Sequence, residues 1–364
     1  MKLYCWGANS YGQLGLGYRS EEEISPKEVS LQNCDFEADD IVSIAGGAGH
    51  TLILDNKGFV YCCGWNSKGQ LALSDDSLKL TQIEILKEFK IVQISCGWDF
   101  SAAVSECGKQ FVWGNNGNTQ LGLSKSITCT GIPSRLQVSQ KLATGFKHVS
   151  CGLRHSAMIT KDGGLVVAGT GAKGQLGLGD NFDDNNYLSI SRVPDLSDVI
   201  SVASGQHHTV VLKDNGTVLS WGENKFGQLG VNPNVANSFV PLEVFNNEGL
   251  KTVFAGWTHS AGLTTNGEVF TWGRNNYGQL GAEREKPYEP EKIPTLNNVS
   301  QLSLGSEHNL AVTAEGKLFT WGWNDHGNCG TGDKKDVKIP THILANKKVK
   351  SAFACTGSSF AVVE

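Results

Sequence analysis

Trp221-Gly-Glu-Asn-Lys-Phe-Gly-Gln-Leu-Gly230 is one copy of a ten-residue motif that recurs along the whole sequence. The motif has the form Trp-Gly-x-Asn-x-x-Gly-Gln-Leu-Gly. Other copies, some of them imperfect, lie at 6–15, 64–71, 113–122, 168–177, 272–281 and 321–330. Their average spacing is about 52 residues, a period that is typical of propellers and other repeat architectures.

A second motif, Gly-x-x-His, alternates with the first. It occurs at Gly47–His50, Gly152–His155, Gly205–His208, Gly256–His259 and Gly305–His308. Gly97–Phe100 carries Phe in place of His, and Cys355–Ser358 is a degenerate seventh copy. The two motifs together predict seven structural units, which account for the whole chain of 364 residues.

Each unit has the pattern of short strands. In the unit that contains Trp221, the apolar segments Ile200–Ser204, Thr209–Leu212 and Thr217–Trp221 are separated by tight turns, one of them Asp214-Asn-Gly216. An Asx-Gly turn between two β-rich segments indicates a hairpin. The long connections supply a fourth strand, for example at Val240–Val244 and at Thr81–Leu86.

Four strands in each of seven units predict an all-β fold, a seven-bladed β-propeller with four-stranded blades. A solenoid is the alternative, but it would need capping ends, and none is visible. Leu3–Trp6 is expected to be the last strand of the blade to which Val349–Val363 contributes the earlier strands. This pairing would close the ring and hide the sheet edges. Residues 1–364 are thus expected to form a single propeller domain.

Composition agrees with this fold and excludes several classes of function. The 44 glycines suit many tight turns, and the net charge of −5 without a basic tail argues against a nucleic-acid partner. No apolar stretch is long enough to span a membrane, and the N-terminus has no secretory signal. We therefore expect a cytoplasmic monomer, with the nucleus as a second location. The ten cysteines include no Cys-x-x-Cys pair, which predicts reduced, buried thiols.

The repeated side chains are expected to have structural roles. The Trp of Trp-Gly would pack between blades, the Gln of Gly-Gln-Leu would satisfy backbone groups of its turn, and the His of Gly-x-x-His would make a structural hydrogen bond. No pattern of catalytic residues, cofactor ligands or metal ligands is present in the sequence.

Positions where the repeat varies are the candidates for binding a partner, because loops on a rigid scaffold carry function. Exposed Trp and Arg are frequent interface anchors. An alternative for Trp98 and Trp257 is that they only pack the central funnel of the ring. The candidate partner-binding residues are Trp98, Asp99, Arg154, Gln206, His207, Trp257, Thr258, Glu307, Trp323, Asp325 and His326.

The two motifs together resemble the regulator-of-chromosome-condensation repeat, and the resemblance covers residues 1–364. Segments such as Cys96–Phe100, Gly305–Val312 and Trp321–Gly327 are more specifically similar to the secretion-regulating guanine nucleotide exchange factors of that superfamily. The resemblance implies a propeller that binds a small GTPase, an exocyst subunit or both, and that regulates secretion. Nucleotide exchange makes and breaks no covalent bond, so no enzyme chemistry is expected.

Two alternative functions remain open at this stage. One is an interaction scaffold without exchange activity, which needs only variable side chains on one rim of the ring. The other is ultraviolet-B sensing, because the plant photoreceptor resembles this fold and uses Gly-Trp-Arg-His-Thr repeats in consecutive blades. Gly-Trp occurs here only at Gly97-Trp98 and Gly256-Trp257, in units that are not adjacent. The sequence therefore predicts that a stacked Trp cluster does not form.

Overall fold

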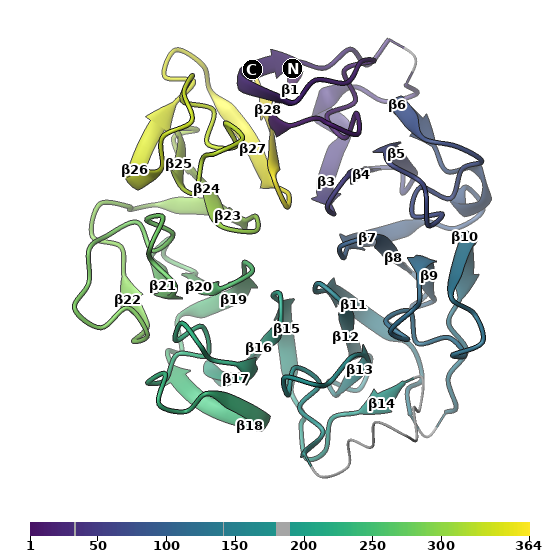
Figure 1. Cartoon of the computed structure of the whole chain (residues 1–364), viewed down its shortest axis with the longest axis vertical. Helices are drawn as coiled ribbons and strands as arrows, with labels where there is room; N and C mark the ends of the chain where they lie inside the picture. The colour runs from purple at the N-terminus through teal and green to yellow at the C-terminus, as the bar shows by residue number, and fades with distance from the viewer. Residues whose placement is uncertain (33, 141, 180–189) are drawn as a thin grey trace.

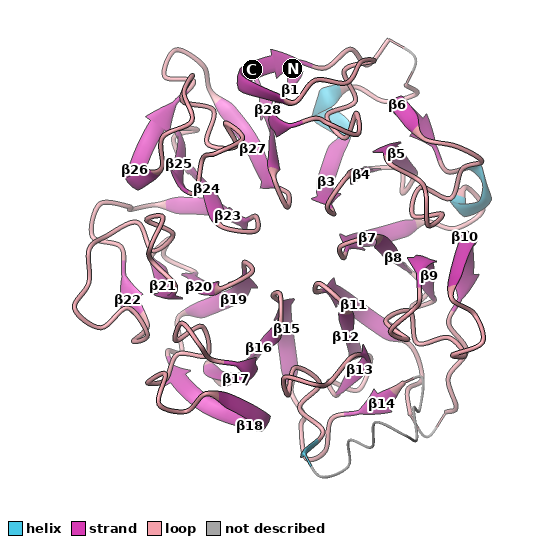
Figure 2. Cartoon of the chain, viewed as in Figure 1, coloured by secondary structure: helices cyan, strands magenta, loops and turns pink. Residues whose placement is uncertain are grey.

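Seven antiparallel four-stranded sheets surround a central axis, as Figure 1 shows. The computed structural model describes residues 1–32, 34–140, 142–179 and 190–364. Strands account for nearly all of its regular secondary structure (Figure 2). The predicted all-β, seven-bladed propeller is therefore confirmed.

We number the blades in chain order and give their strands from the axis outward. Blade 1 is β27 (Val349–Ala354), β28 (Ser358–Val363), β1 (Lys2–Ala8) and β2 (Glu22–Glu28); blade 2 is β3 (Ile41–Gly46), β4 (His50–Asp55), β5 (Val60–Gly64) and β6 (Ser77–Gln82). Blade 3 is β7 (Ile91–Cys96), β8 (Phe100–Ser105), β9 (Gln110–Asn115) and β10 (Cys129–Arg135); blade 4 is β11 (Phe146–Cys151), β12 (His155–Thr160), β13 (Leu165–Gly169) and β14 (Ser191–Arg192). Blade 5 is β15 (Val199–Ser204), β16 (His208–Lys213), β17 (Thr217–Glu223) and β18 (Asn237–Asn246). Blade 6 is β19 (Leu250–Ala255), β20 (His259–Thr264), β21 (Val269–Gly273) and β22 (Glu291–Lys292); blade 7 is β23 (Val299–Leu304), β24 (His308–Thr313), β25 (Leu318–Gly322) and β26 (Val337–Ile343).

The core lies between neighbouring blades, where the motif tryptophans are fully buried. Trp221 of blade 5 packs with residues of blade 4, and its Nε1 donates a hydrogen bond to the Gln175 carbonyl at 3.0 Å. Gln175 in turn accepts the backbone N–H of Lys173 on its side-chain Oε1 at 2.9 Å. The predicted roles of Trp and Gln are thus confirmed, and each copy of the motif ties one blade to the next.

Glycine is required beside the motif tryptophan. Gly222 has a φ of 109°, and a Cβ added there would lie 2.3 Å from the His207 carbonyl oxygen. An L-residue is disfavoured at this φ, and backbone oxygen cannot move aside cheaply. The Trp-Gly pair is therefore a backbone requirement of the blade as well as a packing one.

Ring closure occurs as predicted, with one correction. β1 pairs with β28 from Lys2↔Val363 to Gly7↔Ser358. However, β1 is the third strand of blade 1, because β2 pairs outside it. The N-terminal segment thus supplies two strands to the blade and the C-terminal segment supplies the other two.

The strand predicted over Thr81–Leu86 is only partly correct. β6 ends at Gln82, and a 3-10 turn, η2 (Glu84–Leu86), follows it. The turn buries Leu86, which is 1% exposed, against the base of blade 3. Tertiary burial of this leucine thus outweighs the strand pattern of its segment.

The prediction of reduced thiols holds for the described cysteines, all of which are free, but the prediction of burial does not hold for all of them. Cys107 and Cys129 are exposed. Cys107 lies in a hairpin turn and Cys129 begins the outermost strand β10, so neither position faces a blade interface. A thiol there fills no core space.

Candidate functional site on the loop face

The Gly-x-x-His loops and the Trp-Gly-x-Asn loops lie on the same end of the propeller. The first loop follows the innermost strand and the second follows the third strand, and these two strands run in the same direction in an antiparallel sheet. Hydrogen bonds join the loops within each blade: the backbone N–H of Arg274 donates to Thr258 at 2.9 Å, and that of Glu223 donates to His207 at 2.8 Å. We call this end the loop face.

The repeated histidines support the loop face from below. His208 Nε2 lies 2.9 Å from the Ser260 hydroxyl of the next blade, and this hydroxyl donates to the Gln228 carbonyl at 2.8 Å. Because the serine proton is used in that bond, His208 donates from Nε2, and burial of the ring keeps it neutral. Burial lowers the pKa of His208 to about 3. Equivalent contacts occur at His50, His155 and His308, and at His259 with Asn309 Oδ1. The structural role predicted for these histidines is confirmed.

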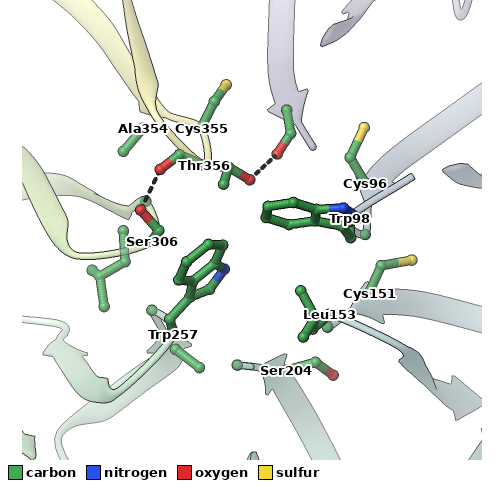
Figure 3. A pocket seen from close by; sticks show the side chains of 18 residues that line it. Cys96, Trp98, Cys151, Leu153, Ser204, Trp257, Ser306, Ala354, Cys355 and Thr356 are labelled. Carbon is green, nitrogen blue, oxygen red and sulfur yellow. Dashed lines mark hydrogen bonds between the residues drawn. The ribbon is translucent and has the colours of Figure 1, made fainter. Parts of the chain in front are cut away.

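Trp98 and Trp257 meet across the mouth of the central channel, as Figure 3 shows. Their ring centroids are 5.5 Å apart, with an interplanar angle of 40°. This is a tilted pair and not the stacked cluster that the sequence excludes, although the two indoles lie closer than the separation of their units suggests. Blades 3 and 6 are distant along the chain, but their loops both point to the axis. Trp98 remains 37% exposed, so the pair caps the channel and also faces outward.

Below the indoles the channel narrows to a cavity of about 100 Å³. Besides the two indoles, its wall consists of glycines, small residues, Leu153, Leu304 and three thiols, those of Cys96, Cys151 and Cys355. Burial raises the pKa of the Cys151 and Cys355 thiols to about 12, so they are neutral. The described residues contain no group of three or more His, Cys, Asp or Glu side chains arranged to hold a metal ion.

Three of the predicted partner-binding side chains face inward. Asp99, Thr258 and Glu307 are each less than 10% exposed. Asp99 accepts a hydrogen bond from Asn115 Nδ2 at 2.7 Å. Glu307 accepts from the Thr258 hydroxyl at 2.6 Å and from Gln279 Nε2 at 2.7 Å. These side chains fix the shape of the loops around them.

The other predicted residues reach the surface at two places besides the channel mouth. Arg154 is exposed on blade 4 beside the half-buried Gln206 and His207 of blade 5. Burial lowers the pKa of His207. The charge of Glu223 acts to raise this pKa, whereas the charges of Lys173 and Arg154 act to lower it further. On blade 7, Asp325 is exposed and the Trp323 indole contacts the His326 ring edge-on at 5.2 Å.

Sequence reasoning missed the residues that connect Trp323 to the neighbouring blades. The Arg274 guanidinium lies 4.7 Å from the ring centroids of both Phe226 and Tyr277, and Tyr277 lies 6.4 Å from Trp323. Glu307 approaches the same guanidinium at 3.9 Å. We call Phe226, Arg274, Tyr277, Trp323 and His326 the aromatic belt, which spans blades 5 to 7.

A regular signal in the motif could have located this belt. In four pairs of successive copies of Trp-Gly-x-Asn-x-x-Gly, the third residue of one copy contacts the sixth residue of the preceding copy. The pairs are Trp65 with Tyr11 (5.1 Å between rings), Glu223 with Lys173 (3.5 Å between charged atoms), Arg274 with Phe226, and Trp323 with Tyr277. Comparing these two positions between successive copies would have predicted the contacts.

Comparison with known proteins agrees with this architecture. The mouse secretion-regulating guanine nucleotide exchange factor is 35% identical over 341 residues, which cover 84% of this chain and 70% of that protein. The ultraviolet-B receptor UVR8 of Arabidopsis thaliana is 33% identical over 311 residues, covering 82% and 68%. Prp20p of Saccharomyces cerevisiae superposes with a TM-score of 0.88 at 23% identity, covering 99% of this chain and 90% of that one.

Among the described residues, no helix is long and apolar enough to cross a membrane. The sequence profile of the RCC1-like domain matches residues 2–363, nearly the full length of the seven-bladed ring. This match and the 35% identity to the mouse protein lead to one conclusion: the chain belongs to the RCC1-like domain family.

Proposed function

We propose that this chain is a guanine nucleotide exchange factor for a small GTPase, that it regulates secretion, and that it engages the GTPase through the loop face. The observation that carries the proposal is the aromatic belt, in which Arg274 is held between two rings on a broad surface. Names of relatives support it: the mouse and Bos taurus proteins at 35% identity are secretion-regulating guanine nucleotide exchange factors. Prp20p is described with its binding to Gsp1p and histones.

An exchange factor needs differential affinity and no bond chemistry. It binds the nucleotide-free GTPase more tightly than the loaded form and so accelerates GDP release. A guanidinium fixed by Phe226, Tyr277 and Glu307 loses little conformational entropy on binding. Its position between two aromatic rings is one that Arg fills better than Lys. Arg274 would therefore serve as an anchor on a prepared surface.

The direct test is to load a panel of small GTPases with fluorescent GDP and to follow its release with and without the protein. Faster release from at least one GTPase supports the proposal. No acceleration across the panel would leave the scaffold function, and capture of purified exocyst subunits would then identify the partner expected from the resemblance. We place the protein in the cytoplasm, with the nucleus as the second location to be checked by imaging.

Arg274→Ala is expected to reduce the exchange rate by about 30-fold, because central Arg anchors often contribute 2 kcal/mol or more. Arg274→Lys keeps the charge but loses the planar stacking, so we expect it to recover only part of the rate. Arg135→Ala, at an exposed position on the outermost strand β10, is the matched control. Equal rates for Arg274→Ala and the control would move the contact away from the belt.

The double variant Trp98→Ala/Trp257→Ala is expected to weaken GTPase capture by about tenfold or more, measured by biolayer interferometry. The indoles contact each other and face outward, so their removal takes apolar area from the centre of the loop face. Thermal melting of the variant separates binding from folding. Normal capture by a folded variant would limit the two tryptophans to closing the channel.

A further inference from the structure

The end of the propeller opposite the loop face carries a repeated irregularity of its own. Every innermost strand has a register shift around its second residue, from Ile41/Ser43 in blade 2 to Val349/Ser351 in blade 1. A β-bulge redirects one side chain out of the sheet, and bulges are frequent at barrel rims and beside binding sites. The second residues are Val42, Val92, Lys147, Ile200, Lys251, Ser300 and Lys350, and all seven are exposed. We call them the basal ring.

The basal ring combines exposed aliphatic side chains with lysines. Val42, Val92 and Ile200 are 52%, 43% and 51% exposed, high fractions for residues of innermost strands. Around the axis, the order of blades 1 to 7 gives Lys, Val, Val, Lys, Ile, Lys and Ser. Blades 4, 5 and 6 follow one another around the ring (Figure 1), so Ile200 of blade 5 has a lysine at the equivalent position of each neighbouring blade.

These two lysines have no carboxylate partner in the part of the chain that the structure describes. Within the described residues Lys147 makes no hydrogen bond or ion pair, and Lys251 reaches only the Ser300 carbonyl, at 3.4 Å. By contrast, Lys350 lies 2.5 Å from a carboxylate oxygen of Asp39. The arc Lys147–Ile200–Lys251 therefore offers two available positive charges on either side of an exposed apolar side chain.

Charged side chains of both signs surround this arc at a larger radius. The hairpin turns between the second and third strands lie on the same end of the propeller. In each blade, the backbone N–H of the residue after the second strand donates to the carbonyl of the residue before the innermost strand. Glu106 donates its N–H to Lys90, and Asp214 donates to Asp198, at 2.9 and 3.0 Å. Glu106, Asp162, Asp214, Glu315 and Glu364 are exposed in these turns or at their equivalent. Glu106, Asp162 and Glu364 are ion-paired with Lys90, Arg192 and Lys348, so this outer zone carries both signs of charge. A narrow acidic chain can instead lie along the arc and contact only Lys147 and Lys251.

We propose that the basal ring is a second docking surface, which binds an extended acidic peptide segment of a partner protein. The segment places an aliphatic side chain against Ile200 and a carboxylate near each of Lys147 and Lys251. Charge complementarity and the exposed aliphatic residue at the centre define this ligand. The surface lies on the opposite end from the loop face, so both surfaces can be occupied at once.

A peptide array tests the proposal. The probes are peptides of about 12 residues, roughly 40 Å when extended, in which one Leu is flanked by two Glu at varied spacing. A second set has Lys in place of Glu. We expect the full-length protein to bind a subset of the Glu peptides and none of the Lys peptides. Failure to bind any Glu peptide, or equal binding to both sets, would overturn the proposal.

Variants then locate the site. Lys147→Glu/Lys251→Glu and, separately, Ile200→Asp should weaken binding of the best Glu peptide by about tenfold or more, measured by fluorescence anisotropy. Lys27→Glu, at an exposed position on the outermost strand β2, is the matched charge-reversal control and should bind normally. Unchanged binding by the Lys147→Glu/Lys251→Glu variant would reject the site, as would cosedimentation with anionic phospholipid vesicles that this variant abolishes. All three variants should retain the exchange rate of the unmodified protein, which separates this proposal from the function of the loop face.

Discussion

The free energy of unfolding of the propeller is expected to decrease steeply as the pH falls from 6.5 towards 5. Burial lowers the pKa of His50 to about 4 and those of His155, His208 and His308 to about 3, against about 6.5 in an unfolded chain. In this pH range the unfolded state therefore takes up protons that the native state excludes. Stability from these histidines is complete above pH 6.5 and is lost as the pH falls towards their folded pKa values.

The expected size is large because the motif repeats the same buried group. Each of the four histidines costs about 2 kcal/mol of stability between pH 7 and pH 5, so together they cost about 8 kcal/mol. The free energy of unfolding of a folded domain is about 5–15 kcal/mol. Urea titrations at half-unit pH steps should thus show a midpoint that falls sharply below pH 6.5 and approaches zero near pH 5.

Blade 3 provides a natural design for the control. It carries Phe100 where blades 2, 4, 5, 6 and 7 carry His, and the Ser156 hydroxyl of the next blade still donates to the Gln120 carbonyl at 2.7 Å. Replacing His208 by Phe removes one proton that the chain takes up on unfolding. The free energy of unfolding should therefore change less steeply with pH, by about 1.4 kcal/mol per pH unit. An unfolding free energy that stays constant between pH 7 and pH 5 would mean that these histidines are not neutral in the native state.

The fold was predictable because each blade repeats local signals that agree with one another. Trp-Gly, Gly-Gln-Leu-Gly and Gly-x-x-His recur in a fixed order, and each has a physical reason that acts inside one unit or between consecutive units. The errors occurred where a local segment is controlled by contacts outside its pattern. Leu86 ends a predicted strand in a 3-10 turn because the base of blade 3 buries it.

The candidate site was less predictable because a ring brings together residues that a linear repeat keeps apart. Trp98 and Trp257 belong to blades that are not neighbours, yet both loops end at the axis. Arg274 carries no distinctive signal alone, and its setting arises from the sixth position of the preceding copy. Burial of Glu307 likewise depends on Gln279 and Thr258 from blade 6. Pairing positions between successive copies recovers the belt, but contacts across the axis require the closed ring.

Removal of residues 1–8 is expected to abolish the folded ring. β1 supplies Leu3, Cys5 and Trp6, each no more than 1% exposed, and it is hydrogen-bonded to β28 on one side and β2 on the other. Losing one buried Trp or Leu side chain costs about 2–5 kcal/mol. The deletion loses both, detaches β2 and exposes the edge of β28, so the total exceeds the stability of an ordinary domain. Circular dichroism and limited proteolysis of the truncated chain report the loss.

Milder variants give a graded measurement of ring closure if the truncated chain is not recovered. Trp6→Ala should reduce the free energy of unfolding by about 3–5 kcal/mol. Trp6→Phe should cost much less, because the Asn328 carbonyl that accepts Trp6 Nε1 at 2.9 Å also accepts the Ser359 hydroxyl at 2.8 Å. If the chain of residues 29–364 is recovered, a synthetic peptide of residues 1–28, which carries β1 and β2, should bind it and restore protease resistance. The same peptide with Trp6→Ala should restore it less. Native melting after deletion of residues 1–8 would show that blade 1 does not depend on β1 for closure.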